Sequence, residues 1–209
     1  HQLSGIGRPR IMARYLNIRM DSDLLAALRP FVEWLHSNVP GIDLLPRIYF
    51  VIDANFVRDE LSFIVRRRNL GARSSLHELC DTSVVTLFAP LVLQNEIEKH
   101  IERWSKELGV SATLLKAHWS DYQKRIVFIR DKVVPGKLAA RMRERDAKDL
   151  PYTNLSENIT ADAILTKDRD IRECGFTTAD PDVVFHLREF ARNKAISLSI
   201  GCLLYTSDA

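Results

Sequence analysis

Hydrophobic and polar positions form alternating blocks between residues 47 and 193, and these blocks predict strands and helices in turn. Short apolar runs typical of buried strands lie at 48–53 (IYFVID), 83–89 (SVVTLFA) and 162–166 (DAILT). Amphipathic or capped segments predict helices at 55–68, 90–108, 111–130, 137–145, 150–159 and 181–193. Short apolar strands separated by helices predict a parallel sheet covered on both faces, which is a three-layer α/β/α sandwich.

Prolines support three of the predicted helix starts. Pro90, Pro151 and Pro181 would each lie in the first turn of a helix, where a missing backbone N–H costs nothing. Asp180 would cap the last of these helices with its carboxylate.

The two ends of the chain follow other patterns. Residues 1–20 are basic and irregular, and an apolar face then predicts a helix from Asp21 or Ser22 to Leu35, kinked at Pro30. We therefore expect an N-terminal helical extension over 1–45, one α/β domain over 46–195 and a truncated end over 196–209. Residues 202–209 (CLLYTSDA) resemble a translated sequencing adapter, so they are excluded from fold reasoning.

Composition narrows the class only moderately. The 209 residues are 46% hydrophobic and 27% charged, which predicts an ordered globular chain. The net charge of +3 permits a polyanionic partner without requiring one. Three cysteines and six histidines lack the spacing of a structural zinc site, and no apolar run approaches bilayer length. These features predict a cytoplasmic protein.

Acidic residues recur where predicted strands end or helices begin. Asp53 alone could be an ordinary helix cap. The same placement, however, is repeated at three other segments, which carry Asp168, then Asp146 and Asp149, then Glu96 and Glu98. Because ligands of parallel sheets collect beyond the carboxyl ends of the strands, we expect these side chains to share one pocket.

Clustered carboxylates imply a cation and a particular chemistry. Carboxylates that lie close together raise one another's pKa values unless a cation balances their charge. Hard oxygen ligands of this type favour Mg²⁺ or Mn²⁺, which can activate water and neutralise charge on a phosphate. The pattern therefore predicts metal-assisted hydrolysis of phosphodiester bonds.

Three stretches resemble the PIN-domain ribonucleases in order and spacing. They are VIDANFV (51–57), APLVLQNEI (89–97) and RDAKDLPYTNLSENITADAILTKDRDI (145–171). The likeness covers about residues 47–175 and leaves out the first 45 residues and a long insert at 105–140. The resemblance implies that residues 46–195 form a PIN-like nuclease domain that cleaves single-stranded RNA with Mg²⁺ or Mn²⁺ and a metal-activated water.

The resemblance also implies roles for single residues. Asp53, Glu96, Asp149 and Asp168 would be the catalytic metal ligands, with Asn55 orienting Asp53 and the Thr166 hydroxyl holding the carboxylates. Glu98 stays an alternative to Glu96, because the spacing from Pro90 is one residue longer than usual. Asp146 and Asp170 are interpreted as solvated carboxylates.

Basic residues near the predicted site are candidates for RNA contacts. Arg66, Arg67 and Arg68 end the first helix, and Lys99 and Arg103 follow Glu96 at helical spacing. A solvated helix end, where cations suit the helix dipole, explains the arginines equally simply.

Other functions remain as alternatives. A haloacid-dehalogenase-type phosphatase also begins with a strand that ends in Asp, but it needs a second acid where this chain has Asn55. A PIN-like module could bind RNA or protein without cleaving it. The expected partner is RNA, and an antitoxin protein or a second copy of the chain would be further partners.

Overall fold

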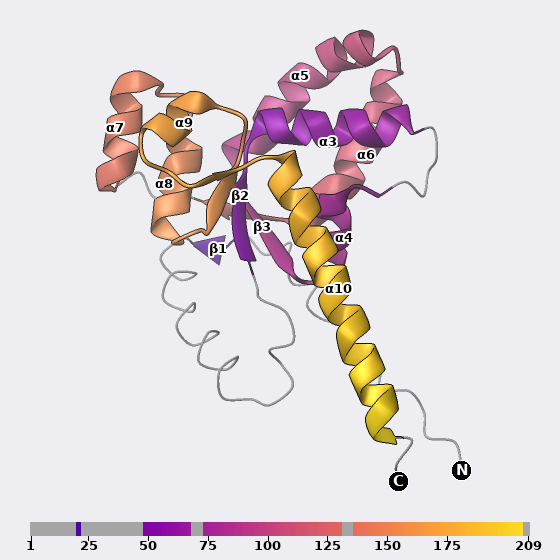
Figure 1. Ribbon diagram of the computed structural model, residues 1–209. Helices are drawn as coiled ribbons and strands as arrows, with labels where there is room; N and C mark the ends of the chain where they lie inside the picture. Colours follow the sequence, from indigo (N-terminus) through magenta and orange to yellow (C-terminus); the bar gives the residue numbers. More distant parts are fainter. Residues whose placement is uncertain (1–19, 22–47, 68–72, 131–135, 207–209) are drawn as a thin grey trace.

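The computed structural model describes residues 20–21, 48–67, 73–130 and 136–206 (Figure 1). A sheet of six parallel strands in the order β1-β4-β3-β2-β5-β6 runs through the molecule. Its strands are β1 (Met20–Asp21), β2 (Ile48–Ile52), β3 (Val85–Pro90), β4 (Ile126–Arg130), β5 (Ala163–Leu165) and β6 (Thr178–Ala179).

Helices cover both faces of this sheet. They are α3 (Ala54–Arg66), α4 (Ser75–Asp81), α5 (Val92–Leu108), α6 (Ala112–Tyr122), α7 (Lys137–Arg145), α8 (Leu150–Asn158), α9 (Arg169–Glu173) and α10 (Pro181–Thr206). Figure 1 shows α3, α5 and α6 on one side of the strands and α7, α8 and α9 on the other. The strand order accounts for this division, because the chain moves from β2 to β4 in one direction and then returns to β5. Crossovers between parallel strands are right-handed as a rule, so a reversal of direction places the later helices on the other face. The predicted three-layer α/β/α sandwich is confirmed.

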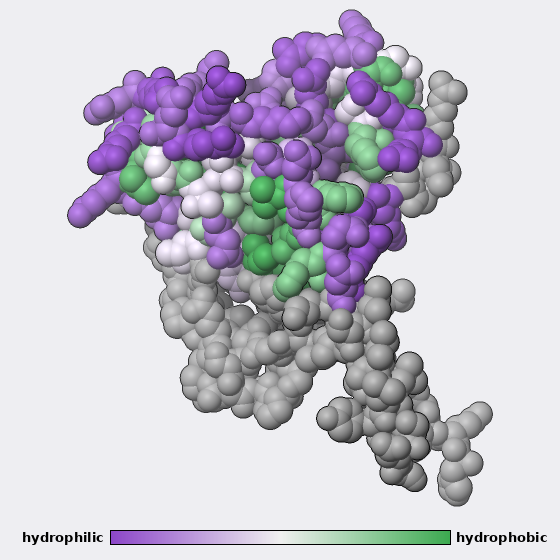
Figure 2. All heavy atoms as spheres, in the orientation of Figure 1, coloured by the Kyte–Doolittle hydropathy of each residue, from purple (hydrophilic) through white to green (hydrophobic). Residues whose placement is uncertain are grey.

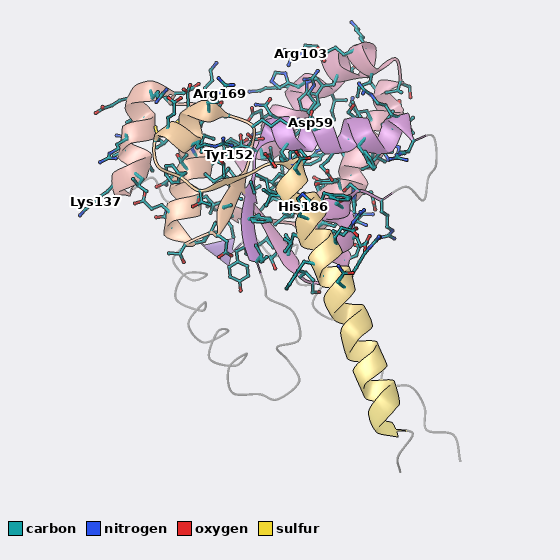
Figure 3. The ribbon with its side chains drawn as sticks, viewed as in Figure 1. Asp59, Arg103, Lys137, Tyr152, Arg169 and His186 are labelled. Atoms are coloured by element: carbon teal, nitrogen blue, oxygen red, sulfur yellow. The ribbon has the colours of Figure 1, made fainter. Side chains whose placement is uncertain are left out.

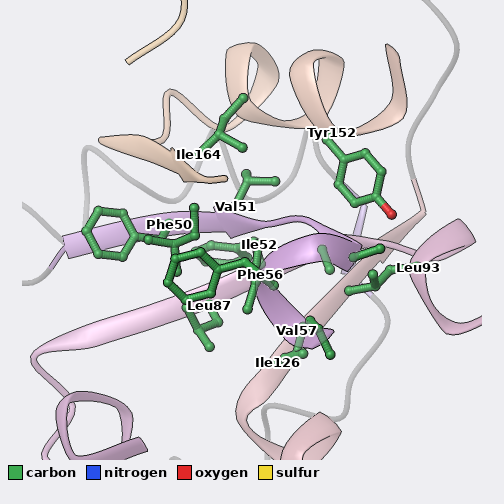
Figure 4. Packing of buried hydrophobic residues seen from close by; sticks show 14 of the residues in the cluster. Phe50, Val51, Ile52, Phe56, Val57, Leu87, Leu93, Ile126, Tyr152 and Ile164 are labelled. Atoms are coloured by element: carbon green, nitrogen blue, oxygen red, sulfur yellow. The ribbon is translucent and has the colours of Figure 1, made fainter. Parts of the chain in front are cut away.

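The central strand β2 explains why its sequence is apolar without alternation. Phe50, Val51 and Ile52 are each at most 4% exposed, because β3 and β5 flank the strand and helices cover both faces. Figure 4 shows Val51 and Ile52 pointing to opposite sides of the strand. Burial on both faces therefore holds the end of β2, and the residue that directly follows this strand, in a fixed position.

The prediction of one helix over 111–130 is wrong in its second half. The helix α6 ends at Tyr122, a single 3₁₀ turn covers Gln123–Arg125, and the strand β4 follows. In β4 four consecutive residues are buried, and the strand pairs with β3 from Leu87 opposite Ile126 onwards. A short apolar run fits a buried helix or a buried strand equally well. Here the hydrogen-bonded pairing with β3 makes the run a strand.

Smaller differences concern the ends of elements. Pro90 is the last residue of β3, opposite Ile129, and not part of a helix. The final helix continues past the predicted end at Asn193 to Thr206. Asp21 lies in the short strand β1, while the rest of the predicted N-terminal helix falls outside the described residues. The sequence patterns also did not predict α4, α9 or β6.

Two predicted helix starts are confirmed in detail. Pro151 lies in the first turn of α8. The Asp180 carboxylate caps α10 by accepting hydrogen bonds from the N–H groups of Asp182 at 3.0 Å and Val183 at 3.1 Å. Such caps satisfy backbone donors that have no partner within the helix.

The packing of α6 allows a matched test of the core. Leu115 is fully buried, whereas its neighbour Leu114 is 39% exposed. We expect Leu115→Ala to lower the free energy of unfolding by about 2–5 kcal/mol, because it removes transfer free energy and leaves a cavity. We expect Leu114→Ala to change it by less than about 0.5 kcal/mol. Urea unfolding of both variants checks this, and equal losses would contradict the assignment of this helix face.

Candidate active site

The candidate site lies where the chain connections diverge at the carboxyl edge of the sheet. The strands β2 and β5 are neighbours, and the chain leaves β2 for the helix layer of α3 but reaches β5 from the opposite layer. Such a switch point opens a crevice in which parallel sheets bind ligands. Asp53 directly follows β2, and Thr166 and Asp168 directly follow β5. Figure 3 shows labelled Asp59, Tyr152 and Arg169 at this same end of the molecule.

Asp53 is a buried carboxylate that also caps a helix. It is 5% exposed, and its Oδ1 accepts a hydrogen bond of 2.7 Å from the N–H of Phe56 at the start of α3. Burial raises the pKa of Asp53 to about 6, and the negative charge of Glu96 adds to the rise. Hydrogen bonds from Thr166 and from the N–H groups of Phe56 and Asn55 act in the opposite direction. The simple cap interpretation is therefore correct but does not account for the charged surroundings.

Thr166 connects two of the predicted site residues. Its side chain is fully buried and hydrogen-bonds to the Asp53 carboxylate. Its Oγ1 also accepts a hydrogen bond of 2.9 Å from the N–H of Asp168. One hydroxyl thus fixes the end of β5 relative to the residue that follows β2.

Glu96 reaches the site from α5 and is held by a tyrosine. The hydroxyl of Tyr152 on α8 donates a hydrogen bond of 2.6 Å to Glu96 Oε2. Burial, followed by this hydrogen bond and nearby negative charge, raises the pKa of Tyr152 well above its ordinary value, so its hydroxyl stays a donor. Glu98 is exposed on the same helix. The geometry therefore brings Glu96, and not Glu98, to Asp53.

Asp149 stands at the N-cap of α8, but its carboxylate does not cap the helix. Only its backbone carbonyl engages the helix, where it accepts hydrogen bonds from the N–H groups of Tyr152 and Thr153. Burial raises the pKa of Asp149 to about 7, and the charges of Asp168, Asp146, Asp53 and Glu96 add to the rise in that order. Among the described residues, neither carboxylate oxygen of Asp149 is used to cap the helix, so both can serve another ligand.

The other predicted residues lie further from this cluster. Asn55 is exposed and supports Asp53 through its backbone N–H. Arg66 and Arg67 are exposed at the far end of α3, about 20 Å from its start. Arg68 falls outside the described residues. Lys99 and Arg103 are exposed on α5, and Arg103 pairs with Glu107 at 3.6 Å.

Tyr152 is the feature of the site that sequence reasoning missed. The residue is 2% exposed, so its ring is not accessible for stacking on RNA. Its sequence signal was only its position three residues after Asp149, in the first turn of a predicted helix. Nothing in that pattern points to a contact with a glutamate 56 residues earlier in the chain.

The four acidic residues have no positive partner in the part of the chain that the structure describes. None of the ion pairs there includes Asp53, Glu96, Asp149 or Asp168. The carboxylates come from four segments, and their negative charges add to the raised pKa values of Asp53 and Asp149. Such an arrangement is costly unless a cation offsets the repulsion.

Comparison with protein families identifies a match to the chain. The model of the PIN domain matches residues 51–191, which include all four carboxylates. The chain belongs to the PIN domain family. A comparison with curated proteins gave no match. PIN domains are a nuclease-type family and generally use divalent metal ions, so the family agrees with the acidic centre of this one.

The residues of this PIN domain fit a divalent ion by their chemistry. The donors are uncompensated carboxylates, and Asp149 offers oxygens that no helix N–H occupies. Within the described residues, no three His, Cys, Asp or Glu side chains form a ready-made metal site. The role of the four residues as metal ligands therefore stays a prediction.

In the part of the chain that the structure describes, no helix is long and apolar enough to cross a membrane.

The raised pKa of Asp53 predicts how the stability of metal-free protein depends on pH. The folded state holds the Asp53 proton more tightly than the unfolded state, with a pKa of about 6 against 3.8. The associated stability is complete below the lower value and is lost as pH rises through the higher one. The loss would be at most about 3 kcal/mol for Asp53 alone. Urea midpoints measured with a chelator across this range should fall as pH rises.

A matched pair of cap variants tests the cause. Asparagine caps helices about as well as aspartate, so Asp53→Asn removes the charge and keeps the cap. We expect this variant to show a shallower fall in stability and to exceed the wild type above about pH 6. Asp180→Asn, at the cap of α10, should keep the wild-type profile. Identical profiles for Asp53→Asn and wild type would contradict the assigned burial of charge.

Proposed function

We propose that the protein is a metal-dependent endoribonuclease, which hydrolyses phosphodiester bonds of RNA at the carboxylate site. The observation that carries the proposal is the convergence of Asp53, Glu96, Asp149 and Asp168 from four distant segments to the switch point of a PIN domain sheet. Unpaired carboxylates at such a position are suited to a divalent cation and, through it, to a phosphate group.

The four carboxylates would hold the ion, which we propose to be Mg²⁺ or Mn²⁺. When bound, the ion would neutralise charge on the scissile phosphate and activate a water molecule. The hydrogen bonds of the protein support this role by fixing the ligands in advance. Thr166 holds the Asp53 carboxylate and the Asp168 backbone, and Tyr152 holds Glu96. Fixed ligands reduce the reorganisation that binding would otherwise require.

One observation favours a second candidate, a PIN domain that binds RNA or protein without cleaving it. The described carboxylates do not already form a group of three that could hold a metal. The pKa values of Asp53 and Asp149 are nevertheless raised, first by burial and then by neighbouring carboxylates, which supports a site that takes up a cation. Cleavage measurements distinguish the two functions directly.

The carboxylates of Asp53 and Asp149 provide the most direct test of this function. Purified protein should cleave single-stranded RNA when Mn²⁺ or Mg²⁺ is added, and a chelator should stop the reaction. Asp53→Asn and Asp149→Asn should each reduce the cleavage rate by at least about 100-fold, since changes even around metal ligands cost 10- to 100-fold. Gel analysis of a labelled RNA across a Mn²⁺ titration measures this. Equal activity in wild type and Asp149→Asn would rule out the mechanism.

Matched substitutions of the two glutamates of α5 test which of them takes part in the site. Glu96→Gln should lower cleavage and raise the Mn²⁺ concentration needed for half-maximal activity, because Glu96 lies among the other carboxylates. Glu98→Gln removes the same charge two residues later, on an exposed position, and should leave both quantities unchanged. If Glu98→Gln were the damaging variant, the assignment of the helix carboxylate would be reversed.

A further inference from the structure

A groove beside the acidic site has no role in the chemistry described above. It has a volume of about 730 Å³ and lies between α3, the start of α4 and the first turns of α10. Figure 2 shows apolar surface over these first turns of α10, bordered by hydrophilic surface. Its lining includes two phenylalanines, five cationic residues and two carboxylates, which are Phe63, Phe185, Arg66, Arg67, Arg73, Lys167, Arg188, Asp59 and Glu60.

The groove begins at the edge of the acidic site. Lys167 lies in the chain between Thr166 and Asp168, and it lines the groove. Its Nζ forms an ion pair with Asp59 on α3, which joins the loop after β5 to that helix. From there the groove follows α3 to Arg66 and Arg67 at the other end of the helix. A chain bound along it would therefore lead directly away from the carboxylates.

Two phenylalanines give the groove partly exposed aromatic side chains. Phe63 on α3 is 36% exposed and Phe185 on α10 is 44% exposed. Each ring has an arginine over it, since the guanidinium carbons of Arg67 and Arg188 lie 4.8 Å from the centroids of Phe63 and Phe185. Flat rings paired with guanidinium groups form surfaces on which unpaired bases stack.

The charge of the groove is positive. Five cationic residues line it, against the two carboxylates of Asp59 and Glu60. Two of the five cations are paired with carboxylates outside the groove, Arg73 with Asp81 and Arg188 with Glu189. Asp59 is paired with Lys167, and Glu60 is turned inwards, where its carboxylate accepts hydrogen bonds from Ser74 and Tyr122. Arg66 and Arg67 form no ion pair with any residue that the structure describes. Their charges are available to phosphate groups.

We propose that this groove binds the single-stranded RNA that extends from the cleavage site, with bases on Phe63 and Phe185 and phosphates at Arg66 and Arg67. This assignment of the substrate path rests on the proposed function of the acidic site. The helix α3 is about 20 Å long. At 3.4 Å for each stacked nucleotide, it would accompany roughly six nucleotides. A duplex keeps its bases paired and could not use the aromatic rings.

Binding can be measured without cleavage. The experiment uses Asp53→Asn protein, a chelator and a fluorescent oligouridine of about 12 nucleotides, within the usual site size of single-strand binders. Phe63→Ala and Phe185→Ala should each weaken the affinity by about 5- to 100-fold, the range found for loss of one base–aromatic stack. Phe190→Ala is the matched control, because Phe190 lies on the same helix, is 47% exposed and does not line the groove.

Salt dependence tests the arginines separately. The double variant Arg66→Ala with Arg67→Ala should reduce the slope of log affinity against log salt concentration by about 0.7 for each phosphate that the variant no longer neutralises. Arg143→Ala, an exposed arginine on α7, should leave the slope unchanged. With an RNA shorter than about six nucleotides, the difference in affinity between the wild type and the groove variants should disappear.

The outcomes separate this proposal from the proposed function. If the groove variants bind RNA as tightly as Phe190→Ala while wild-type protein cleaves RNA with Mn²⁺, the groove proposal is overturned and the nuclease assignment stands. In that case the groove would be a surface for a protein partner. If wild-type protein binds RNA through the groove but never cleaves it, the groove proposal stands and the nuclease assignment fails.

Discussion

The withdrawal of negative charge from water is the constraint on which this site depends, and repulsion between neighbouring carboxylates adds to its cost. Asp53 is almost fully enclosed and Asp149 is half-buried, and this burial is the main reason why the pKa values of both lie above the ordinary range of aspartate. Neighbouring carboxylates add to the rise. A protein selected only for stability would place apolar or neutral residues there, because unpaired buried charge is costly. The fold retains these carboxylates and holds them with hydrogen bonds. Such an arrangement is typical of residues that act in catalysis or binding.

The architecture partly offsets this repulsion. Asp53 and Asp149 stand at the N-termini of α3 and α8, where the partial positive charge of a helix favours a carboxylate. The parallel strands then fix these helix starts at one edge of the sheet. The two carboxylates differ in use, however. Asp53 accepts a hydrogen bond from its own helix, whereas the Asp149 side chain accepts none from α8. One is held rigidly in place, and the other is left open for a ligand.

The sequence allowed most of the fold and the acidic residues to be predicted, for reasons that particular elements make clear. The strand β2 is buried on both faces, so its apolar run ending in Asp53 was distinctive. The strand β4 is also a short run of buried apolar residues, but it follows α6 after a single 3₁₀ turn. The local sequence pattern could therefore not show where the helix ends and the strand begins. The contact of Tyr152 with Glu96 depends on how distant helices pack, and so does the groove between α3 and α10.

The hydrogen bond from Tyr152 to Glu96 has a mechanical consequence. Its donor belongs to α8 and its acceptor to α5, and these helices lie in opposite outer layers of the sandwich (Figure 1). The bond therefore braces the two layers across the open rim of the sheet. A molecule that pulled α5 outwards would displace Glu96 from its neighbours without touching any carboxylate. The width of the crevice and the alignment of its carboxylates would therefore change together.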